Sequence, residues 1–260
     1  ILMEILGYIG ALFIGLVLGL TGGGGSILTV PILVYLMSIN PVTATAYSLF
    51  IVGTTSTFGA IQNYRKNLVD IKNGFIFAIP SFIAVYLTRK FIVPRIPEII
   101  IESPILITKN TFLMLFFAVI MIFGALSVLK KKSQNTNSEE KRNLFLIGIQ
   151  TFTIGIIIGL VGAGGGFLII PSLILFAKLP MKKAVGTSLF IIAMNSLVGF
   201  IGDVQNLEID WMFLLTFSAI SVVGIFLGMY LTKYTNESQL KKIFAYFVLL
   251  MAAIILLKEM

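Results

Sequence analysis

Two stretches of sequence decide the fold: residues 15–31, GLVLGLTGGGGSILTVP, and residues 155–171, GIIIGLVGAGGGFLIIP. A shift of 140 positions, which moves residue 15 onto residue 155, lays glycines on glycines and a proline on a proline. The same shift moves residues 48–51, SLFI, onto residues 188–191, SLFI. Apolar composition alone does not produce a shared spacing of glycine, proline and serine. The chain is therefore interpreted as two fused copies of one unit.

Composition places this chain in a membrane. Its 260 residues are 58% hydrophobic and 12% charged, and the mean hydropathy is +1.03. Soluble domains carry roughly 45–50% apolar and about 25% charged residues. Apolar stretches recur along the whole chain, without the alternating segments of about ten residues that are typical of membrane β-barrels. We therefore expect an all-α polytopic membrane protein in contact with a lipid bilayer.

Cys and His are both absent from the sequence. Disulfides, thiolate chemistry, zinc or haem sites built on these residues, and Ser–His or Cys–His catalysis are therefore excluded. No other nucleophile–base pair is apparent, so we expect no enzyme, no cofactor and no metal site. The formal net charge is +8, and the positive residues are placed in short loops between apolar spans. This pattern indicates orientation in a membrane rather than nucleic-acid binding.

Each half of the sequence offers five apolar segments. They are 4–20, 26–38, 43–61, 73–89 and 110–129 in the first half, and 144–160, 166–177, 184–202, 211–231 and 239–257 in the second. The first segment continues into glycines rather than a cleavage site, so we expect a span and not a signal peptide. Residues 130–142 are polar and predict a cytoplasmic linker between a first repeat, 1–129, and a second repeat, 143–260.

The second apolar segment of each half is too short to cross a bilayer. About 12 residues rise only ~18 Å, whereas the hydrocarbon core is ~30 Å thick. The first two segments of each half therefore form either a hairpin that turns inside the membrane or one broken span. A hairpin puts most of the 19 Lys and Arg residues on one side, whereas a broken span divides them almost evenly. Because basic residues collect in cytoplasmic loops, we favour the hairpin and two inverted repeats.

The glycine-rich hairpin tips are candidate binding elements. Both termini are then expected outside the cytoplasm, with the first tip entering from the cytoplasmic side and the second from outside. Non-helical backbone inside a bilayer must be buried in protein or line a wet cavity, and free N–H groups at a helix start favour a small anion. Close packing is the alternative, and we prefer it for Gly15-xxx-Gly19 and its counterpart. The candidate tip residues are Gly22, Gly23, Gly24, Gly25, Ser26, Gly162, Gly164, Gly165 and Gly166.

The third segment of each half is unusually polar for a membrane helix. Hydroxyl and amide donors suit an oxyanion without the cost of a buried charge, although Ser and Thr also bond back to their own helix. The candidates are Ser48, Ser56, Thr187, Ser188 and Asn195. Charged residues such as Asp203 are placed at segment ends or in loops, and Arg89 is counted among the loop charges. The absence of a buried carboxylate or His argues against a proton pump or a metal transporter.

The doubled Gly-x-x-x-Gly-x-x-Gly-x-Gly-Gly pattern followed by Pro31 or Pro171 resembles the sulfite exporter TauE/SafE family of membrane permeases. Residues 184–189, AVGTSL, and Asp210-Trp211 support the resemblance. It implies a permease of the prokaryotic cytoplasmic membrane that moves small sulfur-containing or organic anions. The first half departs from the pattern, with Tyr47 where the second half has Thr187.

These observations predict a secondary transporter of a small anion. Sulfite or an organosulfonate such as sulfoacetate is the expected substrate, bound at the repeat interface and moved by alternating access. A channel-like anion pore and a non-transporting membrane scaffold are the alternatives. The sequence does not specify the direction of transport, a coupling ion or an oligomeric state.

Overall fold

A computed structural model describes residues 2–101, 107–129, 144–232, 234 and 237–259, and most of them are helical. The predicted linker 130–142 lies outside the described residues. The helices of the first half are α1 (Leu2–Thr21), α2 (Ser26–Tyr35), α3 (Pro41–Arg65), α4 (Ile71–Leu87) and α5 (Lys109–Leu129). Those of the second half are α6 (Leu144–Val161), α7 (Gly166–Phe176), α8 (Met181–Asp203), α9 (Trp211–Leu231) and α10 (Glu237–Glu259).

Helix α4 does not end as a regular helix. A π-helical turn, η1 (Thr88–Ile92), and a 3-10 turn, η2 (Val93–Arg95), continue the chain directly from its end. A short antiparallel pair of strands follows, β1 (Ile99–Ile101) with β2 (Ile107–Thr108). An all-α chain predicts no strands, and this pair lies in the connection between α4 and α5.

Side chains define where three of the long helices begin. The Asn40 side chain accepts a hydrogen bond from the backbone N–H of Val42 and precedes Pro41, so α3 starts with a cap and a proline in its first turn. Asp70 and Asp210 cap α4 and α9 in the same way, since each accepts a hydrogen bond from the N–H three residues ahead. The local sequence therefore fixes these connections before any tertiary packing.

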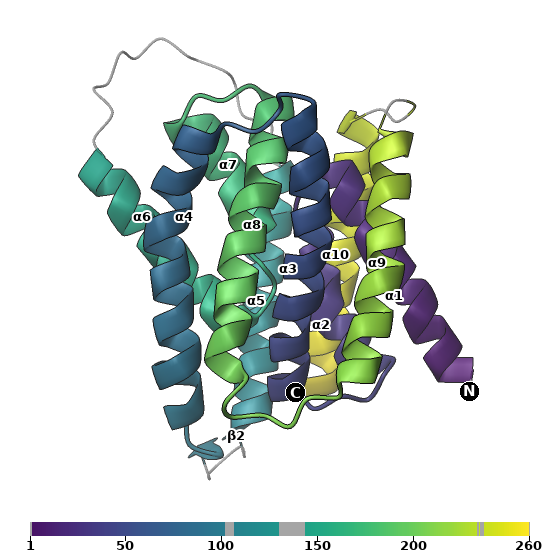
Figure 1. The fold of residues 1–260 in the computed structure, drawn as a ribbon. Helices are drawn as coiled ribbons and strands as arrows, with labels where there is room; N and C mark the ends of the chain where they lie inside the picture. Colours follow the sequence, from purple (N-terminus) through teal and green to yellow (C-terminus); the bar gives the residue numbers. More distant parts are fainter. Residues whose placement is uncertain (1, 102–106, 130–143, 233, 235–236, 260) are drawn as a thin grey trace.

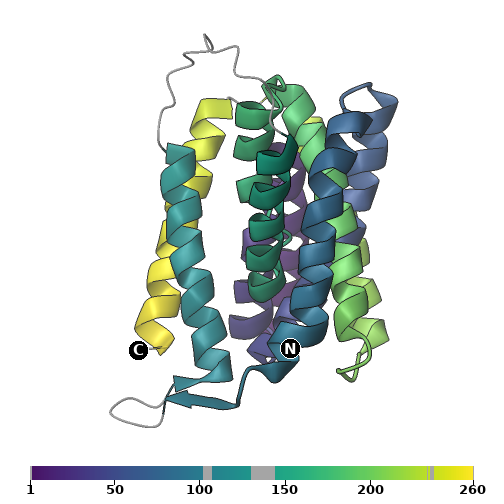
Figure 2. The ribbon, with the colours of Figure 1, turned by 90° about the vertical axis from the view of Figure 1, so that its left-hand side faces the viewer.

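The helices lie roughly parallel to one axis, with α3 and α8 together near the middle of the bundle (Figure 1). On either side of this pair, α1 packs along α9 and α4 packs along α6. Helices α5 and α10 lie side by side at one edge of the bundle (Figure 2). The central position of α3 and α8 is matched by burial, because most of the polar residues of both helices are inside the protein.

Helices α3 and α8 run in opposite directions. The N–H of Asp210, which follows α8, donates to the hydroxyl of Tyr47 near the start of α3 at 2.7 Å. The N–H of Asp70, which follows α3, donates to Oγ1 of Thr187 near the start of α8 at 2.9 Å. Each helix therefore begins beside the connection that ends the other. The 140-residue shift moves Tyr47 onto Thr187 and Asp70 onto Asp210, so the two bonds are equivalent in the two halves.

Both short helices return alongside the helix before them. Gly7 of α1 lies against Met37, just beyond α2, and the hydroxyl of Tyr35 donates to Oε1 of Glu259 at 3.1 Å. The first hairpin therefore enters from the end of the bundle where Leu2 and Glu259 lie, here called the terminal end (Figure 1). The second hairpin enters from the opposite, or linker, end. The expectation that the first tip enters from the side opposite to the termini is wrong, because a hairpin brings its tip in from the side on which its chain begins.

Among the described residues, four helices are long and apolar enough to cross a membrane: Ile71–Arg95, Lys109–Leu126, Met181–Asp203 and Trp211–Leu231. The apolar parts of both hairpins are shorter, at Ile5–Thr21, Ser26–Tyr35 and Phe145–Val161. Large apolar side chains such as Phe145 and Leu257 are exposed on the outer surface, which suits lipid rather than water. The chain is therefore an α-helical membrane protein with several spans.

Candidate functional site

The two glycine tips meet inside the bundle. A Cβ atom on Gly23 would lie 2.6 Å from Cα of Gly166, and a Cβ on Gly166 would collide with Gly23 in turn. No side chain fits between the two backbones. Tip-to-tip packing is thus a sufficient reason for glycine at these two positions, alongside any contact with a ligand.

Positive φ angles account for other glycines of the tips. Gly22 has a φ of 76°, and the matching Gly162 has a φ of 72°. Gly164 and Gly165 also lie in the left-handed region, at 63° and 71°. Residues with a Cβ are strained there, so the chain reverses at these points only with glycine. The tips are therefore fixed, non-helical backbone in the interior of a membrane protein.

Local hydrogen bonds satisfy much of the first tip. Oγ of Ser188 donates to the carbonyl of Gly22 at 2.6 Å, and Oγ of Ser26 donates to the carbonyl of Gly23 at 2.7 Å. The N–H of Gly24 donates to Oγ1 of Thr21 at 2.9 Å, while Gly25 precedes α2 and packs on α1. The Ser188 and Ser26 hydroxyl hydrogens are therefore engaged with the tip itself in this structure.

Unpartnered buried donors lie on the third helices. Ser48, Ser56 and Ser196 are fully buried, and their hydroxyls have no hydrogen-bond partner within the described part of the chain. Oδ1 of Asn195 accepts from Oγ of Ser81 at 2.9 Å, but Nδ2 of Asn195 has no partner there. The face of α3 that carries Ser48 and Ser56 lies against the second tip.

Two contacts of the second tip define that neighbourhood. A Cβ on Gly164 would lie 2.7 Å from Cγ1 of Val52 on α3 and 3.1 Å from Oγ of Ser196 on α8. About two turns earlier along α3, Thr45 lies against Gly162. Thr187 has a different role, since its hydroxyl holds the connection before α4 rather than a tip. Ser188 thus contacts the first tip directly. Ser48 and Ser56 share the face of α3 that carries Val52, and Asn195 precedes Ser196 on α8.

A buried ion pair lies next to the second tip. Arg89 is 0% exposed and Asp203 is 5% exposed, and Nη1 of Arg89 is 3.3 Å from Oδ2 of Asp203. Nη1 also donates to Oγ1 of Thr45 at 3.0 Å. A Cβ on Gly162 would lie 2.5 Å from Nη2 of Arg89. Asp203 is the last residue of α8 and Arg89 follows the end of α4, as expected for charges at segment ends. Their burial was not predicted, and it arises because the π-helical turn carries Arg89 inward and the second hairpin covers it.

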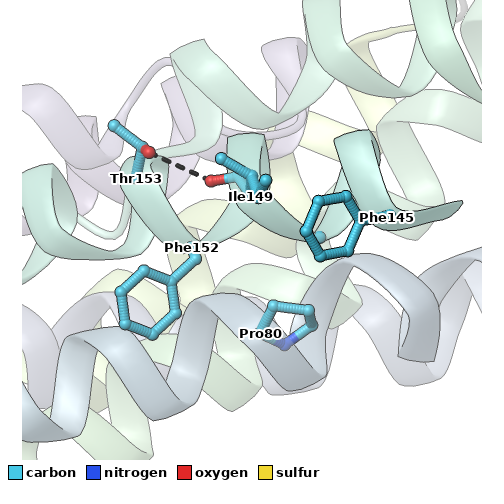
Figure 3. Close-up of a pocket in the computed structure, with 6 residues that line it drawn as sticks. Pro80, Phe145, Ile149, Phe152 and Thr153 are labelled. Atoms are coloured by element: carbon cyan, nitrogen blue, oxygen red, sulfur yellow. Dashed lines mark hydrogen bonds between the residues drawn. The ribbon is translucent and has the colours of Figure 1, made fainter. Parts of the chain in front are cut away.

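Two cavities differ in character. One of about 340 Å³ lies at the terminal end and is lined by polar and charged residues that include Lys109, Asn206 and Asp203. Another of about 440 Å³ lies between α4 and α6, where Pro80 faces the rings of Phe145 and Phe152 (Figure 3). Because Phe145, Ile149 and Phe152 are exposed, this second cavity is an apolar surface groove that suits lipid chains. The polar cavity is the one continuous with the buried ion pair.

Comparison with known proteins places this architecture in a family. The model of the sulfite exporter TauE/SafE family matches residues 8–255. The chain belongs to that family. A "Probable membrane transporter protein" of Xylella fastidiosa is 26% identical over 246 residues, which cover 92% of this chain and 89% of the relative. "Probable membrane transporter protein YunE" of Bacillus subtilis is 28% identical over 244 residues, covering 83% and 82%. No solved structure matches the chain.

This member of the TauE/SafE family carries two site features that sequence reasoning missed, Arg89 and Asp203. The signal was available in the 140-residue shift, which puts Arg89 on Met229 and Asp203 on Asn63. Nδ2 of Asn63 donates to Gly59 O at 2.9 Å and contacts Sδ of Met229 at 3.4 Å. One copy of the repeat has a charged pair where the other has a neutral pair. This difference between the copies singles out Arg89 and Asp203.

Proposed function

We propose that this TauE/SafE protein is a secondary transporter of a small oxyanion, either sulfite or an organosulfonate such as sulfoacetate. Residues 1–129 and 143–260 would act as inverted repeats joined by the linker 130–142, and the substrate would bind between them. Support comes from the opposite directions of α3 and α8 and from the paired bonds of Tyr47 and Thr187. Transporters built from inverted repeats hold substrate at broken helices near the membrane midplane.

The observation that carries the proposal is the contact between the two tips, with unpartnered donors beside them. A buried hydroxyl or amide without a partner costs about 1–3 kcal/mol. Ser48, Ser56, Ser196 and Nδ2 of Asn195 bear this cost on the two central helices, α3 and α8. An oxyanion passing between the tips would accept hydrogen bonds from such groups, and neutral donors would release it again.

The charge distribution supports an orientation. Lys66, Lys72, Lys178, Lys182 and Lys183 belong to loops and helix starts at the linker end. Positive residues collect in cytoplasmic loops. We therefore place the linker end in the cytoplasm and the terminal end outside, in the cytoplasmic membrane of a prokaryotic cell.

Flux into proteoliposomes tests the proposal. The purified protein should move radiolabelled sulfite or sulfoacetate with saturation, and unlabelled anion inside the vesicles should accelerate uptake. Alternating access requires this counter-flow, because the loaded carrier returns faster than the empty one. Saturable uptake without counter-flow stimulation would indicate a channel-like pore.

Glycine variants connect that flux to the tips. Gly164→Leu should abolish flux, since a side chain there would collide with Val52 and Ser196. Gly148→Leu is the matched control, because a Cβ at Gly148 meets nothing within 4 Å. Equal flux in both variants would contradict a role for the tips in transport.

A further inference from the structure

One edge of the Arg89 guanidinium is buried and unused. Nη1 contacts Asp203 and Thr45, whereas Nε and Nη2 have no hydrogen-bond partner among the described residues. The N–H groups of Nε and Nη2 point in nearly parallel directions, which is the geometry that holds two oxygens of one carboxylate, sulfonate or phosphate. A fully buried guanidinium with this edge free is costly, and a ligand that supplies two oxygens removes the cost.

The neighbouring glycine keeps that edge clear of side chains. A Cβ on Gly162 would lie 2.5 Å from Nη2, so any other residue there would cover the donor. Gly162 belongs to the second tip, whose backbone has a positive φ at this point. The free edge is therefore directed at the same tip that the proposed function assigns to the substrate.

The other copy of the repeat shows that the fold does not need the ion pair. Met229 and Asn63 stand at the positions that match Arg89 and Asp203, and they contact each other as the charged residues do. Asn63 and Met229 lie where α3 packs on α9, and Asp203 and Arg89 lie where α8 packs on α4 and the turn that follows it. Since a neutral pair serves in the same surroundings, structural need does not explain two buried charges, which are expensive to desolvate.

We propose that the Nε–Nη2 edge of Arg89 binds the oxyanion group of the substrate in a bidentate manner. The inference rests on the proposed anion transport and adds the residue that recognises the charge. The class of ligand is a small anion with at least two oxygens on one atom, such as sulfite, a sulfonate or a carboxylate. A halide cannot bridge the two donors and would bind poorly.

Asp203 regulates this contact. It is the carboxylate paired with Arg89, and it also lines the polar cavity of about 340 Å³ at the terminal end. Lys109, which is buried, and Glu98 line the same cavity, so charges of both signs lie near Asp203. An anion that arrives from this end meets Asp203 before Arg89. The carboxylate contacts Nη1, not the edge assigned to the substrate. Its negative charge partly neutralises the guanidinium and repels the anion, which favours release once the anion has moved on.

Four variants test the assignment by titrating the detergent-purified protein with sulfite and following the shift in melting temperature. Chloride at equal ionic strength is the reference. Arg89→Met should weaken apparent sulfite affinity roughly 10- to 100-fold, the equivalent of losing a charge-assisted contact. Asp203→Asn should strengthen it, because the negative charge that repels the anion is gone. The double variant should be as weak as Arg89→Met, and it reproduces the neutral pair of the other copy and therefore should fold.

Lys90→Met is the matched control, since Lys90 carries the same charge one residue away but bonds to Tyr86 instead. It should leave sulfite affinity unchanged. Arg89→Lys keeps the charge but not the two-donor edge, so it should bind sulfite nearly as weakly as Arg89→Met. Wild-type sulfite affinity in Arg89→Lys would overturn the bidentate contact. Wild-type sulfite affinity in the double variant would show that Arg89 and Asp203 do not take part in binding.

The controls also separate this inference from the proposed function. Loss of affinity in Arg89→Met with retained affinity in Lys90→Met supports both. A wild-type protein that neither transports nor is stabilised by sulfite, sulfoacetate or acetate overturns the proposed function, and the assignment of Arg89 falls with it. Saturable wild-type transport with an unchanged double variant overturns the assignment of Arg89 alone.

Discussion

At the scale of single residues, the interior is divided between polar groups that hold the fold and polar groups that do not. Ser81 and Ser188 donate to neighbouring elements, whereas Ser48 and Ser56 have no partner within the described ranges. The first kind contributes to stability through its hydrogen bond. The second kind lowers stability, and the proposed function assigns it to contact with a ligand. Single substitutions therefore distinguish the two kinds.

Ser56→Ala should keep or slightly raise the melting temperature while it weakens sulfite affinity. The hydroxyl that is removed has no partner, so its loss removes a desolvation cost rather than a bond. Differential scanning fluorimetry with and without sulfite measures both effects. Ser81→Ala is the contrasting variant, because it breaks the bond to Asn195 and should cost about 1 kcal/mol of stability. A large loss of stability in Ser56→Ala would contradict this division.

Gly166→Ala should destabilise the protein by about 1–3 kcal/mol, the usual range for overpacking. The added methyl group would meet the backbone of Gly23, which cannot move as a flexible side chain could. Gly148→Ala, with open space around the new atom, should be neutral. The melting temperatures of the two variants in detergent make the comparison. Equal stability would mean that the tips separate easily.

At the scale of helices, two cross-connections tie each third helix to the other half. Tyr47 accepts from Asp210 at the terminal end, and Thr187 accepts from Asp70 at the linker end. Breaking either bond should cost about 1 kcal/mol. Since the bonds are at opposite ends of the bundle, their losses should add in a double variant. Their positions also suggest opposite effects on access.

Tyr47→Phe should favour a conformation open at the terminal end, and Thr187→Val one open at the linker end. Each removes a single bond from the end at which it lies, so it lowers the free energy of opening there. Alkylation of single cysteines introduced along α3 would report the two states. The same direction of change in both variants would contradict alternating access about these helices.

Elements were predictable to different degrees. The glycine runs predicted where α1 and α6 end, because four glycines cannot continue a helix, and the short segments after them predicted α2 and α7. The burial of Arg89 could not be predicted from local sequence. Its neighbours Thr88 and Lys90 look like the polar end of a span, and the inward turn depends on a π-helical distortion and on the covering tip. The hydrogen bond from Asp70 to Thr187 likewise depends on tertiary packing.

At the scale of the whole molecule, both described ends of the chain lie on one side, and the end of α5 and the start of α6 lie on the other (Figure 1). The absence of native Cys allows single-cysteine labelling without background. In intact cells, an impermeant maleimide should label Ser38→Cys at the exposed α2–α3 connection and should not label Asn67→Cys at the exposed α3–α4 connection. Permeabilised cells, in which both should react, are the control. The reverse pattern would invert the proposed orientation.

The meeting of Gly23 and Gly166 has a consequence for leakage. Because the two backbones touch without an intervening side chain, neither hairpin can advance without displacing the other. A passage open to both faces would require both to withdraw at once and leave an empty space in a densely packed interior, which is energetically unfavourable. Withdrawal of one tip while the other follows it avoids that void. The contact between Gly23 and Gly166 would thereby prevent a leak through the protein during transport.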